Sequence, residues 1–198
     1  YIAVLDRQSH RLKKLTEDLV EASKASSGVL NVIPAPCEVG VLLEQVQGEY
    51  AERLHAHDLN LIVQTPDKTL TVLADGRHLG RIFDNLMNNI IKYAQPGTRV
   101  YLDARAGLDP AAPGGSRPVA VITFRNVSAE PLNIPAEELL ERFVRGDASR
   151  HTEGSGLGLA IVQSLTELQG GSFRLEIDGD LFKAIVSFPQ DGTQELHA

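Results

Sequence analysis

A stripe of amide and ammonium side chains follows one face of a strongly periodic segment. Asp75 is a plausible N-cap for a helix that runs to about Tyr93. At about 100° per residue, Asn89 lies about 40° and Lys92 about 20° from Asn85, beside a separate apolar stripe. An amide oxygen suits Mg²⁺ and a lysine suits a phosphate, so we interpret this stripe as a binding face. A solvated polar face is the alternative interpretation.

A glycine-rich run leads directly into a second apolar segment, which we expect to be a helix from Leu157 to Leu168. The run is Gly154-Ser155-Gly156-Leu157-Gly158. Glycines let a backbone approach a ligand closely, and the free N–H groups of a helix start attract anions. A polyphosphate is therefore the expected ligand, with a flexible hinge as the alternative. The run matches neither a dinucleotide-binding fingerprint nor a P-loop.

Between these two segments lies an arginine-rich stretch with Arg142, Arg145 and Arg150 around Gly146. Guanidinium groups bind phosphates through several donors, so this stretch could close over a phosphate as a lid. A merely solvated loop is an equally simple explanation of the same charges.

In their order along the chain, these motifs resemble the catalytic and ATP-binding domain of bacterial two-component sensor histidine kinases. That domain belongs to the gyrase, chaperone, kinase and mismatch-repair ATP-binding superfamily. The segment 85–93 is similar to the family's asparagine box, Glu141-Arg142-Phe143 to its phenylalanine box, and 154–158 to its second glycine box. The resemblance covers roughly residues 34–189 and implies that ATP and Mg²⁺ bind here.

The resemblance also implies a role for individual residues. Asn89 would coordinate Mg²⁺, Tyr93 would pack near the adenine, and Arg142 and Arg145 would approach the γ-phosphate. Asn85 and Lys92 would lie beside the phosphates. The implied nucleotide-binding set comprises Asn85, Asn89, Lys92, Tyr93, Asn126, Ser128, Phe143, Gly154, Ser155, Gly156, Leu157 and Gly158.

One motif departs from the family pattern. The family's first glycine box is Asp-x-Gly-x-Gly, and its aspartate accepts a hydrogen bond from the adenine amino group. Here the corresponding register reads Asn126-Val127-Ser128-Ala129-Glu130. Asn126 can still accept through its carbonyl oxygen, but the negative charge is lost. We expect this loss to weaken the hydrogen bond by about 1 kcal/mol, so that nucleotide still binds with lower affinity.

The residue four positions before Asn89 separates two activities. In the hydrolase branches of the superfamily a glutamate there activates water, whereas Asn85 offers no basic carboxylate. The resemblance therefore implies a protein histidine kinase that transfers the γ-phosphoryl group to a histidine, for onward transfer to an aspartate of a response regulator. Two alternatives remain open: a dimerising module of the same fold that has lost nucleotide binding, and an ATP hydrolase.

The first segment of the chain predicts a long helix from Ile2 to about Ser26. Leu5, Leu12 and Leu19 recur every seven residues, as in a coiled coil or helical bundle. By the resemblance, residues 1–33 form the second helix of the dimerisation and phosphoacceptor hairpin plus a linker, and 34–198 form the ATP-binding domain. His10 is a poor candidate for the phosphoacceptor because Arg11 replaces the acidic neighbour of the family motif.

The remaining pattern predicts the elements that position the motifs. We expect helices at 37–55 and 136–142, and a surface loop at 107–118. Strands are expected at 60–64, 71–74, 100–106, 119–124, 173–177 and 181–188. This order agrees with the fold that the resemblance implies, an α/β two-layer sandwich with a mixed sheet covered by helices on one face.

Composition excludes several other classes of protein. The 198 residues carry 26 acidic and 19 basic side chains, a formal net charge of −7 that argues against nucleic-acid binding. The one cysteine allows no intramolecular disulfide and fits a reducing compartment. No apolar run is long enough to cross a bilayer. Because the chain opens on Tyr1, we expect a piece of a longer protein, the cytoplasmic part of a membrane-bound sensor that dimerises through its hairpin.

Overall fold

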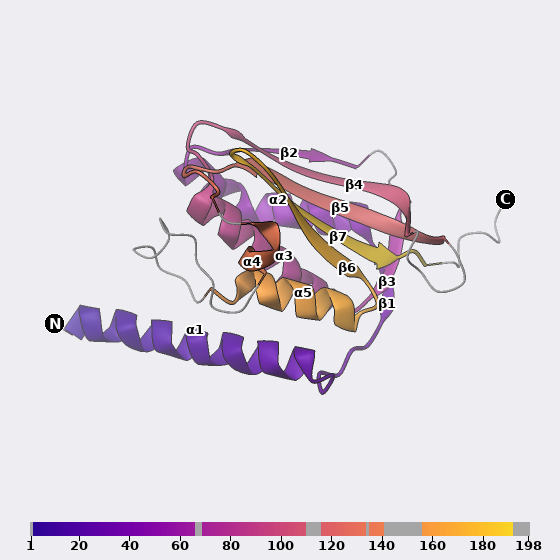
Figure 1. The fold of residues 1–198 in the computed structure, drawn as a ribbon, viewed down its shortest axis with the longest axis horizontal. Helices are drawn as coiled ribbons and strands as arrows, with labels where there is room; N and C mark the ends of the chain where they lie inside the picture. The colour runs from indigo at the N-terminus through magenta and orange to yellow at the C-terminus, as the bar shows by residue number, and fades with distance from the viewer. Residues whose placement is uncertain (1, 66–68, 110–115, 134, 141–155, 192–198) are drawn as a thin grey trace.

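Figure 1 shows a mixed β-sheet with helices α2, α3 and α5 packed against one of its faces. This computed structural model describes residues 2–65, 69–109, 116–133, 135–140 and 156–191. Within them the sheet has five strands in the order β2-β4-β5-β7-β6. Their bounds are β2 Asn60–Gln64, β4 Arg99–Asp109, β5 Arg117–Val127, β7 Leu181–Pro189 and β6 Ser172–Asp178. β2 runs parallel to β4 and the other neighbours are antiparallel, which confirms the expected mixed sheet.

The core lies between the sheet and the helices α2 (Val39–Ala56), α3 (Gly76–Tyr93) and α5 (Gly158–Leu168). Alternate residues of β5 face it: Ala120, Ile122 and Phe124 are fully or almost fully buried. Phe124 packs against Phe83 of α3 with 5.6 Å between ring centroids. The intervening residues of β5 face the opposite, uncovered side of the sheet, as the period of two requires. The two-layer arrangement expected from the sequence is thus confirmed.

A second, two-stranded sheet was not foreseen. β1 (Ala35–Glu38) pairs antiparallel with β3 (Thr71–Ala74), and Cys37 lies opposite Val72. The expected helix from Cys37 therefore starts only at Val39. The expected strand 71–74 is present, but it pairs with β1 and not with the preceding strand. Periodicity within a segment cannot reveal a partner strand that lies more than thirty residues away.

The long central hairpin extends further than the sequence indicated. Strands β4 and β5 continue to Asp109 and from Arg117, into the stretch expected to be a loop. Leu108 pairs with Pro118 and Asp109 with Arg117, so the ladder overrides the local Gly and Pro signals. The short helix α4 covers only Ala136–Leu139, whereas the expectation extended it to 142. Of that extension, 141 and 142 lie outside the described residues.

Helix α1 (Ile2–Ser26) has the expected bounds and lies alongside α5 (Figure 1). The side chains of its predicted seam, Leu5, Leu12 and Leu19, are 68%, 66% and 44% exposed. The part of the chain that the structure describes therefore leaves this apolar seam largely uncovered. No helix in these same ranges is long and apolar enough to cross a bilayer.

Candidate functional site

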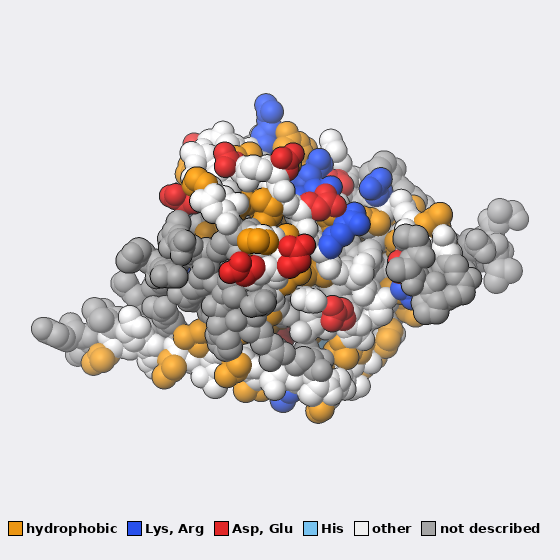
Figure 2. All heavy atoms as spheres, viewed as in Figure 1, with side chains coloured by type: hydrophobic (Ala, Val, Ile, Leu, Met, Phe, Trp, Pro, Cys, Tyr) orange, Lys and Arg blue, Asp and Glu red, His pale blue; other side chains and the backbone are white. Residues whose placement is uncertain are grey.

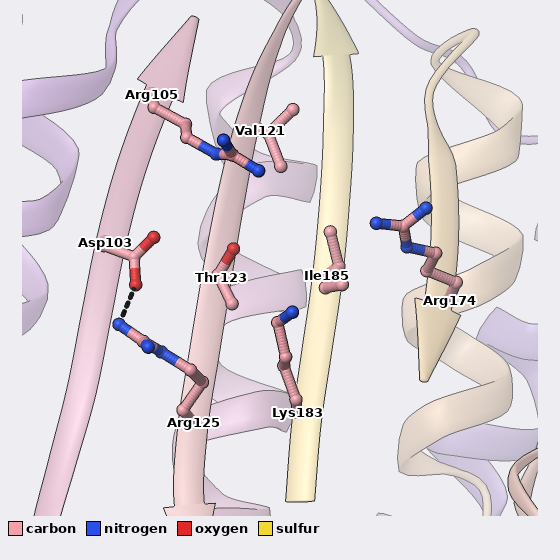
Figure 3. A pocket seen from close by; sticks show the side chains of 8 residues that line it. All are labelled: Asp103, Arg105, Val121, Thr123, Arg125, Arg174, Lys183 and Ile185. Carbon is pink, nitrogen blue, oxygen red and sulfur yellow. Dashed lines mark hydrogen bonds and ion pairs between the residues drawn. The ribbon is translucent and has the colours of Figure 1, made fainter. Parts of the chain in front are cut away.

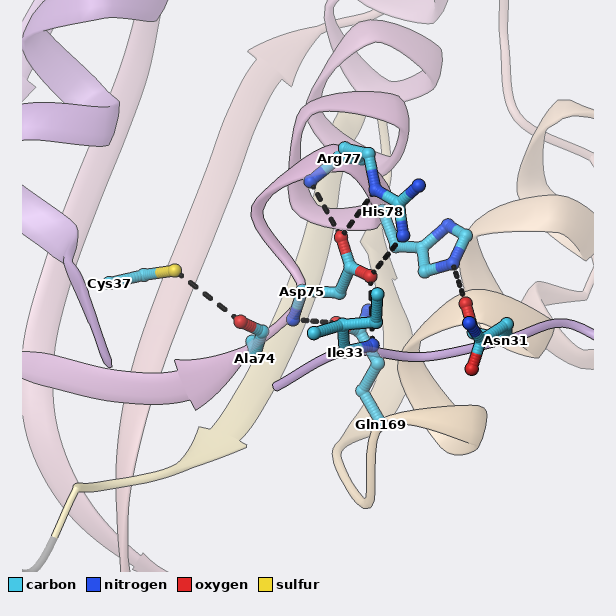
Figure 4. A network of polar contacts seen from close by, with 8 residues as sticks. All are labelled: Asn31, Ile33, Cys37, Ala74, Asp75, Arg77, His78 and Gln169. Atoms are coloured by element: carbon cyan, nitrogen blue, oxygen red, sulfur yellow. Dashed lines mark hydrogen bonds and ion pairs between the residues drawn. The ribbon is translucent and has the colours of Figure 1, made fainter. Parts of the chain in front are cut away.

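Helix α3 begins at a buried carboxylate that also holds the preceding linker (Figure 4). Asp75 accepts hydrogen bonds from the backbone N–H groups of Arg77 and Ile33, each at 3.0 Å. Its oxygens also accept from the Arg77 guanidinium at 3.2 and 2.8 Å. The Asp75 backbone N–H donates to the side chain of Gln169, just after α5, at 2.8 Å. The N-cap expected from the sequence is therefore present, and it fixes α3 against both the linker and α5.

The two stripes of α3 separate as the helical spacing predicted. Its apolar stripe is buried in the core and comprises Leu79, Ile82, Phe83, Leu86, Met87, Ile90 and Ile91. Asn85, Asn89 and Lys92 are half-buried at the border of that stripe. Lys92 Nζ donates to Tyr93 Oη at 2.5 Å and lies 4.5 Å from the centroid of the Tyr93 ring. The polar stripe is thus partly shielded from solvent, and its role as a binding face stays a prediction.

Asn85 contacts the start of α5 directly. Its amide Nδ2 donates to the backbone oxygen of Arg81 at 2.8 Å, which leaves the carbonyl oxygen for other partners. A Cβ added at Gly158 would lie only 3.3 Å from Asn85 Oδ1. The structure therefore brings the asparagine motif and the last glycine of the glycine motif together, and only a glycine fits there without displacing its neighbour.

The N-cap residue of α5 cannot cap the helix with its own side chain. This residue is Leu157, which is fully buried and has no side-chain acceptor for the first-turn N–H groups. Gly156 before it adopts a φ of +70°, a left-handed conformation that favours glycine. The N–H groups of a first helical turn and the positive end of the helix dipole together favour an anion at such a position. This arrangement fits a phosphate group.

The end of α3 is joined to the end of β5. The backbone N–H of Ala129 donates to the Tyr93 oxygen at 2.8 Å, and Ala94 and Ser128 form an isolated bridge. The Ser128 N–H donates to the Asp180 oxygen at 2.7 Å. Tyr93 and the altered first glycine box therefore lie side by side, although more than thirty residues separate them in the sequence.

Asn126 is the polar residue of this region with an unmet hydrogen-bonding need. It is only 3% exposed, and its amide nitrogen donates weakly to the Val127 oxygen at 3.2 Å. Its Oδ1 atom is buried and has no hydrogen-bond partner among the described residues. A buried acceptor without a donor costs about 1 to 3 kcal/mol, so the site favours a ligand that brings a donor. An exocyclic amino group such as that of adenine fits this need.

Asn88 has a structural partner that sequence reasoning missed. Its Oδ1 accepts from Arg53 of α2 at 2.7 Å, and the Arg53 guanidinium lies 5.0 Å from the centroid of the Tyr50 ring. Tyr50 donates to Asp84 at 2.8 Å, and burial together with this hydrogen bond raises the pKa of Tyr50. Asn88 therefore helps to join α2 to α3. This contact accounts for the asparagine at position 88 as a structural residue, with no need for a ligand.

Arg81 was also missed. Its guanidinium donates to Asp18 at 2.7 Å and to Glu21 at 2.8 Å, both on α1. Its side chain is one-third exposed, and Asp18 is almost fully buried. Asp18 and Glu21 are three residues apart and so lie on one face of α1. That spacing identifies them as partners of Arg81 only once α1 is known to lie near α3. These three side chains, which we call the Arg81 clasp, link α1 to the helix that carries Asn85.

Several predicted site residues lie outside the described ranges: Arg142, Phe143, Arg145, Gly154 and Ser155. Within the described ranges no group of three or more His, Cys, Asp or Glu side chains is placed to hold a metal ion. An amide oxygen such as that of Asn89 is a hard donor of the kind that suits Mg²⁺. This ion commonly completes its shell with water and phosphate oxygens, so the residues present fit a phosphate-bound Mg²⁺.

A family model and sequence relatives both indicate the same family for this chain. A family model described as histidine kinase-, DNA gyrase B- and HSP90-like ATPase matches residues 74–194. The chain is 32% identical over 173 residues to the signal transduction histidine-protein kinase BaeS of Escherichia coli K12, covering 86% of this chain and 35% of that protein. It is 26% identical over 191 residues to the sensor protein VanS of Enterococcus faecium, covering 96% and 47%.

Solved structures share the fold. Full-length ShkA in complex with AMPPNP superposes with a TM-score of 0.78 at 23% identity, covering 96% of this chain and 38% of that one. The nucleotide-free catalytic domain of the histidine kinase ThkA gives 0.65 at 18% identity, covering 80% and 96%. The chain spans between about a third and a half of the length of the two relatives matched by sequence.

Proposed function

Because the chain belongs to the family of histidine kinase-, DNA gyrase B- and HSP90-like ATPases, we propose that it binds Mg·ATP and acts as the catalytic portion of a sensor histidine kinase. The observation that carries the proposal is the buried Oδ1 of Asn126, which has no hydrogen-bond partner among the described residues and lies on the strand end joined to Tyr93. The start of α5 beside Asn85, with the positive end of its helix dipole, supplies a complementary position for phosphates.

Within this proposal each side chain has a defined task. Asn126 accepts from the adenine amino group, and the backbone N–H groups of the first turn of α5, from Gly158 onward, bind phosphate oxygens. Asn89 holds the Mg²⁺, which neutralises phosphate charge, and Lys92 supplies a positive charge near the phosphates. Arg142 and Arg145 are assigned to the γ-phosphate on the strength of their motif alone.

Calorimetric titration of Mg·ATP into the 198-residue chain tests nucleotide binding. We expect saturable heat with wild type and a loss of most of the affinity in Asn89→Ala. Absence of detectable heat at millimolar nucleotide would favour the second candidate, a dimerising module of the same fold that does not bind nucleotide. The departure from an aspartate at Asn126 is the specific observation that keeps this candidate open.

Phosphoryl transfer is tested separately by adding radiolabelled Mg·ATP and a histidine-containing hairpin domain from a related kinase. We expect label on the hairpin with wild type and none with Asn89→Ala. Steady release of inorganic phosphate that disappears in Asn85→Ala would instead support an ATP hydrolase. Asn85 argues against that activity, since its amide cannot act as a general base.

We further propose that the whole protein dimerises through α1 and passes its phosphoryl group to a response regulator, as the cytoplasmic part of a membrane-bound sensor. The exposed seam of Leu5, Leu12 and Leu19 supports a helical partner. The relatives named as sensor proteins support the signalling context. Replacing Leu12 by Ser should lower the dimeric fraction in sedimentation experiments with a chain that contains the complete hairpin.

A further inference from the structure

The face of the sheet opposite the helices carries a hollow of about 190 Å³ bordered by cationic side chains (Figure 3). Arg105 of β4, Arg125 of β5, Lys183 of β7 and Arg174 of β6 line it. A second hollow beside Gln64 and Thr65 of the β2 end shares Arg105 and Arg125 with the first. Figure 2 shows Lys and Arg side chains gathered over the middle of this sheet, with acidic ones between them.

Strand register places these side chains on one face. Asp103 lies opposite Thr123, Thr123 opposite Ile185, and Ile185 opposite Arg174, which gives one row across four strands. Arg125, Lys183 and Glu176 form the next row. Because paired residues in a sheet point to the same side, the cations share a single surface.

The acidic side chains of this surface do not balance its cations. Arg125 is paired with Asp103 at 2.6 Å, while Lys183 and Arg174 share Glu176 at 2.7 and 3.3 Å. Arg105 makes no ion pair with any residue that the structure describes. Four cations against two carboxylates leave a local excess of two positive charges, in a chain whose formal net charge is −7.

One polar group at the hollow also lacks a partner. The Nε atom of Arg125 is buried and makes no hydrogen bond to a residue that the structure describes. Buried polar groups of native proteins are nearly always hydrogen-bonded, so this donor in a cation-lined hollow indicates a missing acceptor. The side chain of Thr123, which is 5% exposed, lies on the same face and carries a hydroxyl group.

We propose that this hollow binds a small phosphate-class dianion. In Figure 3 the guanidinium groups of Arg105 and Arg174 extend from opposite edges toward the middle strands, and the Lys183 ammonium lies between Thr123 and Ile185. Cations on several sides and a hydroxyl at the floor suit a tetrahedral oxyanion better than a planar carboxylate. The charge of a phosphate dianion equals the local excess.

This site is separate from the nucleotide site. The helices α3 and α5, which carry Asn89 and Gly158, pack on the other face of the same sheet. Variants on the two faces therefore report on the two sites independently, and the proposal does not depend on ATP binding.

Calorimetric titration of inorganic phosphate at constant ionic strength tests the proposal. We expect saturable binding that weakens roughly tenfold in Arg105→Gln and in Arg174→Gln. Arg99→Gln is the matched control, since this exposed arginine lies on the same strand but about 20 Å from Arg105. Unchanged thermal unfolding of each variant in phosphate-free buffer verifies its fold.

Asn89→Ala gives the second control, because it should leave phosphate binding unchanged. Binding lost in Asn89→Ala but retained in Arg105→Gln would overturn the proposal by assigning the phosphate to the nucleotide site. Absence of saturable binding, both to free phosphate and to phosphatidic acid vesicles, would also overturn it. Vesicle binding that Arg105→Gln abolishes, without binding of free phosphate, would assign the site to a lipid phosphate.

Discussion

At the scale of single residues, Asn126 serves the fold and the ligand in opposite ways. Its buried Oδ1 has no partner in the part of the chain that the structure describes, which disfavours the ligand-free fold, yet the same oxygen suits the amino group of adenine. Family members with an aspartate at this position hold a charge there. A neutral amide costs less free energy to bury than a carboxylate. As an uncharged acceptor, it also forms a weaker hydrogen bond with the adenine amino group.

Asn126→Leu should therefore change stability and affinity in opposite directions. Replacing the amide by a side chain of similar size removes a buried unsatisfied oxygen, so we expect equal or higher thermal stability without nucleotide. The dissociation constant for Mg·ATP should rise about five- to tenfold, the equivalent of about 1 kcal/mol. Thermal unfolding measures the stability and titration calorimetry measures the affinity. Unchanged affinity for Mg·ATP would refute the assignment of adenine to Asn126.

Gly158→Ala should reduce nucleotide affinity without unfolding the chain. The added methyl group would lie 3.3 Å from Asn85 Oδ1 and would displace that oxygen by a few tenths of an ångström. Gly80→Ala is the matched control, since Gly80 lies within α3 with nothing near its Cβ position. Alanine there should stabilise the helix by about 1 kcal/mol and leave Mg·ATP affinity unchanged. Equal affinities for the two variants would contradict a role for the contact.

Sequence motifs predicted that Asn85 and Gly158 belong to one site. The structure places the two residues close together, and their shared role in nucleotide binding stays a prediction. Motifs did not predict the role of Asn88, because its partner Arg53 is 35 residues away on another helix. Nor did they predict that Asn126 Oδ1 is buried and unpartnered. Both facts depend on which elements pack together, and that information is not local in the sequence.

At the scale of elements, the Arg81 clasp should determine how firmly α1 lies against the ATP-binding domain. Asp18→Asn removes the charge of an almost fully buried carboxylate that binds Arg81 at 2.7 Å. We expect faster hydrogen exchange of the α1 amides and a loss of about 1 to 3 kcal/mol of contact energy.

The neighbouring acid on the same helix provides the control for that experiment. Glu17 forms an ion pair with Lys13 of the same helix at 3.9 Å, and both side chains are largely exposed. Such surface pairs contribute between about 0 and 1 kcal/mol, so the α1 amides of Glu17→Gln should exchange hydrogen at the wild-type rate. Equal exchange rates in Asp18→Asn and Glu17→Gln would show that the Arg81 clasp does not hold α1.

The Asp75 network should make stability depend on pH in a defined direction. Hydrogen bonds from the Arg77 side chain and from the Ile33 and Arg77 amides hold the pKa of Asp75 well below its usual range, despite burial. A depressed folded-state pKa stabilises the fold above the unfolded-state value of about 3.9. This contribution is lost as the pH falls further through the folded-state pKa.

Asp75→Asn should accordingly be less stable than wild type at pH 7 and show a flatter stability profile between pH 4 and pH 2. Urea unfolding at a series of pH values gives both quantities. The exposed Asp178 supplies a control, since Asp178→Asn should keep the wild-type profile. Parallel profiles for Asp75→Asn and wild type would show that another carboxylate dominates.

At the scale of the whole molecule, the spacing of apolar residues predicted the helices and most strands. Each segment that buries one face shows this spacing in its own sequence. Pairings between distant segments were not predictable in this way. The β1–β3 sheet joins residues 35–38 to 71–74, and the long β4–β5 ladder overrides Gly107 and Pro118. The domain boundary near residue 33 stays a prediction. The backbone N–H of Ile33 donates to Asp75, so the linker is attached to the N-terminus of α3 at this position.

The parallel pairing of β2 with β4 restricts where the chain could be cut. Strand neighbours Gln64 and Asp103 are joined through a connection that contains the whole of α3, so this helix is the crossover of the pair. A circular permutant opened within that crossover would separate α3, which carries Asn85 and Asn89, from either β2 or β4, the two strands that anchor it. One opened between Asp109 and Arg117, where β4 ends and β5 begins, would leave both anchors intact and should retain the nucleotide site.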